Sequence, residues 1–165
     1  MRTLRLKVYK FDELSDEAQQ NALNELSDIN VDPNWWDFTY EDAKDIGLKI
    51  TSFNLDRNRH ANGEFILAAN EVAQNVLNYH GENCETYKIT VSFMEVWQPI
   101  FNTYMETEEG EDELMEIEEQ YLKDLLSEYS QILQNESEYL QSKESIKETI
   151  LANDWDFLEN GKMYL

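Results

Sequence analysis

Apolar and polar residues alternate along the beginning of the chain. Leu4, Leu6 and Val8 share one face of an extended segment, and polar residues between them take the other. An alternation of period two is typical of a half-buried strand. We therefore expect a strand over residues 3–11.

The pattern then changes to a helical spacing. Ser15 is a favourable N-cap, and apolar residues follow it at intervals of three and four from Ala18 to Ile29. A second helix is predicted to begin at Asp32-Pro33 and to end at Gly47, because proline suits the first helical position and glycine the residue after a helix. Trp36, Tyr40 and Ala43 share a face of this helix.

The middle of the chain mixes both patterns. Residues 48–55 are rich in β-branched and aromatic residues, which predicts a strand followed by a loop over 56–63 and a helix ending near His80. Residues 87–101 fit a strand or a helix. We prefer a helix with its stripe on Tyr87, Val91, Met94 and Gln98, bent or ended near Pro99.

From Glu111 an apolar stripe runs from Leu114 to Ile132 at helical spacing. One helix from there to Ala152 would be about 63 Å long, so we expect a break, with a new helix capped at Ser145 or Ser142. The tail from Trp155 to Leu165 resembles a hairpin with a type I′ turn at Asn160-Gly161.

These elements predict an α+β fold in a single domain over residues 1–165. The expected sheet is small and mostly antiparallel, built from the first strand, the 48–55 strand and the C-terminal hairpin, and covered by helices. A long acidic helical region is expected over residues 106–148.

Charge then narrows the functional classes. The 165 residues include 35 acids and 13 Lys or Arg, a formal net charge of −22. Such a field repels nucleic acid and anionic membranes and favours basic partners. The chain has no apolar run long enough to span a bilayer and no signal-peptide pattern, so we expect a cytoplasmic protein. The single cysteine, Cys84, cannot form an internal disulfide.

The acids are concentrated in residues 106–148, which hold 15 acids and three lysines. The alternative to a binding surface is a solvated helix face whose first acids favour the helix dipole. Spread over the whole region, the charge is about one per 5 Å, more dilute than duplex DNA at about one per 1.7 Å. We expect partner binding by Glu106, Glu108, Glu109, Glu111, Asp112, Glu113, Glu116, Glu118, Glu119 and Trp35.

Trp35 belongs to a dense aromatic cluster with Trp36, Phe38 and Tyr40. These side chains cannot all face one core of a helical segment, so Trp35 or Phe38 is expected to be partly exposed, as an interface anchor would be. Packing in the core is the competing interpretation.

Catalytic patterns are weak. His80 and Cys84 lie close together in sequence, but no further zinc ligands accompany them. A structural role at the end of a helix is sufficient to explain His80. The loop 56–64 lacks the glycine of an EF-hand. Arg57 and Arg59 are candidates to bind a carboxylate or a phosphate, or to form internal ion pairs. We predict no enzyme activity, no metal and no cofactor.

Residues 7–18, 35–43, 47–53 and 153–155 together resemble a group of small acidic, largely uncharacterised proteins of phages and bacterial mobile elements, sometimes labelled antitoxin-like. The resemblance implies a setting of phage–host or toxin–antitoxin conflict.

Three functions follow as hypotheses. The first is a non-enzymatic protein that binds and blocks a basic, nucleic-acid-binding protein such as a nuclease, as a phage anti-defence inhibitor, an antitoxin or a DNA mimic. The second is a self-associating assembly protein, for instance a homodimer, that uses Trp35, Trp36 and the Leu114–Ile132 stripe. The third is a metal-dependent hydrolase with clustered carboxylates.

Overall fold

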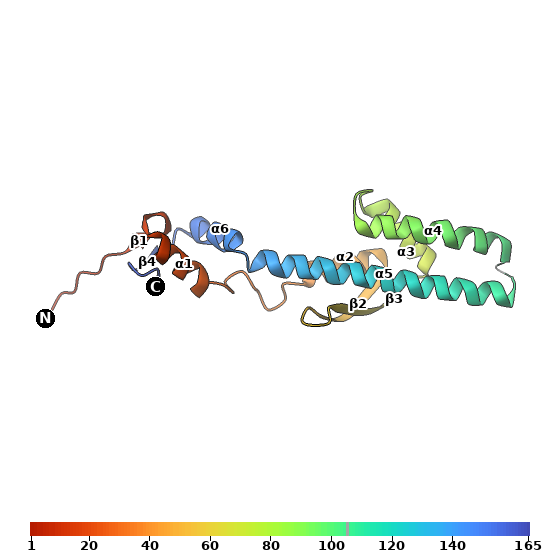
Figure 1. Cartoon of the computed structure of the whole chain (residues 1–165), viewed down its shortest axis with the longest axis horizontal. Helices are drawn as coiled ribbons and strands as arrows, with labels where there is room; N and C mark the ends of the chain where they lie inside the picture. The colour runs from red at the N-terminus through yellow and green to blue at the C-terminus, as the bar shows by residue number, and fades with distance from the viewer. Residues whose placement is uncertain (105) are drawn as a thin grey trace. The chain divides into compact units, whose positions relative to one another are not determined.

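A computed structural model describes residues 1–104 and 106–165 (Figure 1). The chain divides into two compact units: Met1–Trp35 with Asn135–Leu165 form unit 1, and Trp36–Gln134 form unit 2. The described residues contain six α-helices and short antiparallel strands, which confirms the α+β class. The prediction of a single domain stays a prediction, and the units are described separately.

Unit 1 packs two helices with a three-stranded sheet. The helices are α1 (Asp16–Glu25) and α6 (Lys143–Asn153), and the strands lie in the order β1 (Tyr9–Lys10), β4 (Asp156–Phe157), β5 (Met163–Tyr164). A 3₁₀ helix, η1 (Phe11–Glu13), joins β1 to α1. The core of this unit is formed by Phe11, Leu14, Ala18, Ala22, Leu23, Ile146, Ile150 and Phe157.

Serine side chains begin both helices of unit 1. The Ser15 hydroxyl accepts the backbone N–H of Ala18, and the Ser142 hydroxyl accepts that of Ser145 at 3.2 Å. The cap at Ser15 and the break before α6 are therefore confirmed, and Ser142 is the cap of α6.

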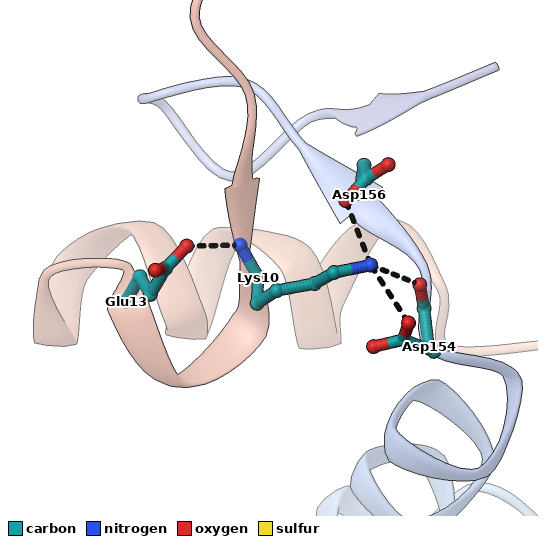
Figure 2. Close-up of polar contacts among 4 residues, drawn as sticks. All are labelled: Lys10, Glu13, Asp154 and Asp156. Atoms are coloured by element: carbon teal, nitrogen blue, oxygen red, sulfur yellow. Dashed lines mark hydrogen bonds and ion pairs between the residues drawn. The ribbon is translucent and has the colours of Figure 1, made fainter.

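Lys10 ties β1 to the end of α6 (Figure 2). Its Nζ lies 2.9 Å from Oδ1 of Asp156 and 3.0 Å from Oδ2 of Asp154, and it also donates to the Asp154 carbonyl. The hydrogen bond to Asp156, and after it the one to Asp154, raise the pKa of Lys10. Lys10 therefore connects β1 to the residue after α6 and to β4 through charged contacts.

The prediction of a strand over residues 3–11 is wrong for most of its length. Only Tyr9 and Lys10 form strand, and residues 1–8 lie outside the helices and strands. Leu4 is 95% exposed, and Leu6 and Val8 are exposed as well. The period-two pattern is present, but within the described chain no strand pairs with it.

The C-terminal hairpin is confirmed, but its turn is not type I′. A type I′ turn needs positive φ at two consecutive residues, and among residues 158–162 only Gly161 has it. The Gly161 N–H donates to the Leu158 carbonyl, and the Leu158 N–H donates to the Lys162 carbonyl. This is the three-residue loop in which a type I turn is followed by a glycine bulge.

Unit 2 places a β-hairpin among four helices. Its elements are α2 (Asp37–Ile46), β2 (Leu48–Asn54), β3 (His60–Phe65), α3 (Ala69–Tyr79), α4 (Glu85–Tyr104) and most of α5 (Glu108–Leu140). The predicted 48–55 strand is confirmed as β2. Its partner is β3, where a loop was expected, so the prediction of one sheet shared with the first strand and the C-terminal hairpin is wrong.

The helix predicted from Asp32-Pro33 begins later, at Asp37, and ends before Gly47 as expected. Tyr40 and Trp36 both meet Phe53 of β2 edge to face, with ring centroids 6.1 and 5.6 Å apart. This confirms the aromatic face of α2.

Residues 85–104 form one helix, so the helical preference for this segment is confirmed and Pro99 does not end it. Its buried residues are Thr86, Thr90, Phe93 and Trp97. The predicted stripe is therefore wrong by one position, and Val91, one of its members, is exposed.

The apolar stripe of α5 is confirmed. Tyr121, Leu125 and Tyr129 are buried in the core of unit 2, with Leu114, Ile117 and Ile132 partly buried against it. The ring of Tyr121 stacks on Phe93 with centroids 4.0 Å apart, which joins α5 to α4. None of the described helices is both long and apolar enough to cross a membrane.

Candidate protein-interaction surface

Helix α5 begins in the acidic segment. The Thr107 hydroxyl accepts the backbone N–H of Gly110 at 3.0 Å, as an N-cap residue does, and donates to the Tyr104 carbonyl. The helix starts at Glu108, three residues before the predicted position. Glu108 and Glu109 lie in the first turn, where the helix dipole favours anions.

Gly110 makes the junction of α4 and α5 possible. A Cβ at this position would lie 2.0 Å from the backbone oxygen of Tyr104, far inside van der Waals contact. The end of α4 therefore approaches the first turn of α5 closely, and the acidic turn is held against the folded unit.

Most of the predicted partner-binding acids lie in solvent. At 100° per residue, six of them fall within about 140° of the helix circumference, on the side away from Leu114 and Tyr121. We call these six side chains the acidic face; its members, all exposed, are Glu108, Glu109, Asp112, Glu113, Glu116 and Glu119.

The other three predicted acids differ. Glu106 is exposed but precedes the helix, and Glu111 is exposed at the side of the acidic face. Glu118 is half-buried and accepts a hydrogen bond from Nε1 of Trp97 at 2.9 Å. Glu118 therefore stabilises the contact between α4 and α5 and is not part of the acidic face; its role in partner binding stays a prediction.

The acidic face is unfavourable for the helix itself. Residues 106–122 contain nine acids and no Lys or Arg. Three pairs are spaced i,i+4, namely 108/112, 109/113 and 112/116, and each such like-charge pair costs about 0.2–0.5 kcal/mol. The dipole compensates only in the first turn. The helix dipole thus explains acids at Glu108 and Glu109, but it does not explain those at Glu116 and Glu119.

Within the predicted aromatic cluster, Phe38 is more exposed than Trp35. Trp35 is half-buried, whereas Phe38 is 86% exposed on α2. Trp35 belongs to unit 1 and the acidic face to unit 2, so the acidic face is described without it.

A polar cluster connects α2, α3, α4 and α5. Nδ1 of His80 lies 2.6 Å from the Thr86 hydroxyl, and its Nε2 lies 3.6 Å from Oδ1 of Asp42. The Tyr129 hydroxyl donates to Oδ2 of Asp42 at 2.7 Å. The carboxylate, imidazole and hydroxyl lie in the order of a catalytic triad, but Thr86 is buried, so the cluster fastens helices together.

The charges of this cluster shift its proton equilibria. Contact with His80 lowers the pKa of Asp42; burial opposes this, and the Tyr129 hydrogen bond lowers it further. Burial, followed by the nearby charge of Asp42, raises the pKa of Tyr129. The stable form is a carboxylate that accepts a hydrogen bond from a neutral phenol.

Other chemical candidates have structural partners. Arg59, the residue before β3, donates to the side-chain oxygen of Gln131, and Nδ1 of His60 lies 2.6 Å from the Asn58 carbonyl. The Arg59 interaction joins the hairpin to α5. Within residues 1–104 and 106–165, no three His, Cys, Asp or Glu side chains are grouped to hold a metal ion.

Sequence reasoning missed a groove of about 470 Å³ between α4 and α5. Its floor includes Ile89, Phe93 and Ile117, and Asp124 and Glu85 lie at its edge. The apolar residues of α4 and α5 were visible in the sequence, but the pairing of the two helices was not. The wrong stripe on α4 turned these residues away from α5.

No family model, no curated protein and no solved structure matches the chain. The resemblance to small acidic phage proteins stays a prediction.

Proposed function

We propose that the protein is a non-enzymatic, cytoplasmic interaction protein that binds and blocks a basic, nucleic-acid-binding protein through the acidic face of α5. The observation that carries the proposal is the acidic face itself: six exposed acids on one side of a helix, with no cation between residues 106 and 122. Clustered repulsion of this kind is relieved by a cationic partner.

The charge density of the acidic face complements a partner surface that binds phosphates. From Glu108 to Glu119 the acidic face spans about 16 Å, or about one charge per 3 Å. Duplex DNA has about one per 1.7 Å. A short anionic strip of this density complements a few phosphate-binding cations of a nuclease or similar protein. It is too short to replace a long duplex.

The surrounding unit reinforces this field. Unit 2 holds 21 acids and six Lys or Arg, a net of −15, whereas unit 1 holds 14 acids and seven, a net of −7. A field concentrated on one unit steers a basic protein toward it and accelerates association.

Two charge variants with equal net charge test the proposal. The face variant carries Glu108→Lys, Asp112→Lys, Glu116→Lys and Glu119→Lys. The dispersed variant carries Glu25→Lys, Asp28→Lys, Glu82→Lys and Glu136→Lys, all exposed positions outside the acidic face. Each is used as bait in a lysate of the source organism, beside the wild type, and bound proteins are eluted by salt.

We expect the wild type and the dispersed variant to retain the same basic nucleic-acid-binding protein, and the face variant to lose it. Equal loss from both variants would reduce the effect to net charge and refute the proposed surface. Retention by the face variant would place the binding site elsewhere.

A further inference from the structure

The groove between α4 and α5 is an apolar surface with an acidic margin. Its floor combines buried rings with a more open side chain, Val96, which is 51% exposed. The apolar lining residues are Ile89, Phe93, Val96, Ile117 and Tyr121. An open apolar strip of this kind accepts small apolar side chains of another segment.

Both helices contribute a carboxylate to the lining of the groove. Asp124 and Glu85 line it together with Lys88, which pairs with Glu85 at 3.0 Å. Helical spacing puts Glu113 one turn before Ile117 and Glu128 one turn after Asp124. Burial, and then repulsion from Glu85, raise the pKa of Glu128. Lys88 and the nearby Arg59 offset part of this charge, and the margin keeps an excess of carboxylates over cations.

Residues 1–8 have the opposite character, and we call them the arm. Leu4, Leu6 and Val8 are exposed, although their spacing suits one face of an extended segment. Among the described residues, none forms an ion pair with Arg2, Arg5 or Lys7. The arm thus exposes alternating apolar and cationic side chains in a protein of net charge −22.

We propose that the arm of one copy binds in the α4–α5 groove of a second copy. In an extended segment, side chains two positions apart point the same way and lie about 7 Å apart. Leu4 and Leu6 then reach the apolar floor together, and Arg5 and Lys7 turn toward the acidic margin. The occupant is a second copy because the chain itself supplies a segment complementary in pattern and in charge. This inference does not rest on the proposed function.

Self-association of the full chain is the first readout, measured by sedimentation velocity over a range of concentrations. At about 150 mM salt the Debye length is about 8 Å, which screens the repulsion between two acidic copies more than it weakens contact pairs. We expect a mass that rises with concentration. A monomer at every concentration would overturn the proposal.

Variants locate the two halves of the contact. Leu4→Ser with Leu6→Ser keeps the charge but removes the apolar contacts, and Val96→Asp places a carboxylate in the groove. Each is expected to weaken association about tenfold or more. The matched control is Val91→Asp, an exposed valine of the same helix that does not line the groove. Equal weakening by Val91→Asp would overturn the assignment to the groove.

A peptide of residues 1–10 with a fluorescent label provides a test independent of variant folding. It is expected to bind the wild-type protein and the Val91→Asp variant equally. Its affinity for the Val96→Asp variant should be lower by about tenfold or more. Absence of binding to the wild type would contradict the proposal.

Carbodiimide coupling of a mixture of ¹⁴N and ¹⁵N protein distinguishes a second copy from the same chain. Amide links from Lys7 to Asp124 or Glu128 are expected between light and heavy copies. Links found only within one isotope would show that the arm binds its own chain and would refute the dimeric contact.

Discussion

Two buried hydroxyl contacts join α5 to the rest of unit 2. The Tyr121 hydroxyl lies 2.7 Å from that of Thr90, which itself donates to the Thr86 carbonyl. The Tyr129 hydroxyl donates to Asp42. Burial raises the pKa of Tyr121 to about 12, so its hydroxyl is a neutral donor at physiological pH. Both contacts are long-range in sequence.

Replacing Thr90 by valine tests the first contact. Thr90→Val keeps the shape but removes the acceptor of the buried Tyr121 hydroxyl, which should lower the free energy of unfolding by about 1–3 kcal/mol. The double variant Thr90→Val with Tyr121→Phe should recover part of this loss, because neither polar group is left unpaired. Urea unfolding measures both; additive losses would contradict the pairing.

Replacing Tyr129 by phenylalanine tests the second contact through pH. At pH 7 Tyr129→Phe should lower the free energy of unfolding by about 1 kcal/mol, because a hydrogen bond to a partly exposed carboxylate is lost. The pKa of Asp42 is lowered from 3.8 in the folded state. Its stabilisation is therefore present above that value and lost as the pH falls through the lowered pKa.

The difference between wild type and Tyr129→Phe should accordingly stay constant from pH 7 to about pH 4 and shrink as the pH falls below 3.8 through the lowered pKa of Asp42, as measured by urea unfolding. Tyr79→Phe is the matched control, since Tyr79 is an exposed tyrosine of the same unit, and it should have little effect at either pH. A difference that grows at pH 3 would contradict the sign argued here.

At the residue scale, the sequence predicted hydrogen bonds between near neighbours but not those between distant residues. The caps at Ser15 and Ser142 depend on residues three positions away, so they could be predicted. The hydrogen bond from Tyr129 to Asp42 joins residues 87 positions apart, and no local pattern indicates it. Glu118 was grouped with the binding acids because its indole partner lies on another helix.

At the scale of elements, the acidic face should make α5 less stable than its length allows. Glu116 gains nothing from the dipole and repels Asp112, Glu113 and Glu119. Glu116→Gln should therefore raise the free energy of unfolding by about 0.5 kcal/mol. Glu108→Gln, in the first turn, loses a favourable dipole interaction but also relieves the 108/112 repulsion, so it should leave the free energy of unfolding nearly unchanged. Thermal and urea unfolding of both variants measure the contrast. Destabilisation by Glu116→Gln would contradict the claim that the acidic face is unfavourable for the helix.

Gly110 gives a second prediction for this element. Alanine usually stabilises a helix relative to glycine by about 1 kcal/mol. Here the added Cβ would strike the backbone oxygen of Tyr104, so Gly110→Ala should destabilise the protein by about 1–3 kcal/mol. Gly81→Ala is the control, because its Cβ would meet only Cys84 Sγ at 3.9 Å. A neutral Gly110→Ala would contradict the close junction of α4 and α5.

Elements with strong local patterns could be predicted, and those defined by pairing could not. The stripe of α5 and the break before α6 follow from apolar spacing, length and capping. The strand β3 was missed because Asn62 and Gly63 favour turns, and its pairing with β2 is a tertiary contact. In the arm the opposite occurred: a good strand pattern has no pairing strand in the described chain.

For the whole molecule, the predicted helices and strands indicated the fold class but not the arrangement of the strands. The two sheets belong to different units, which the sequence does not mark by any linker rich in glycine or proline. The net charge likewise predicted a basic partner. The structure shows which acids of α5 form the acidic face, and that Glu118 instead accepts a hydrogen bond from Trp97.

Quantitative binding tests the acidic face most directly. The protein retained by the wild type would be purified and titrated with the wild type, the face variant and the dispersed variant at about 50 and 200 mM salt. We predict that the face variant binds more than about tenfold more weakly, with a smaller salt dependence, while the dispersed variant stays within about threefold of the wild type. Equal affinities and equal salt dependence for the two variants would contradict the acidic face of α5 as the binding surface.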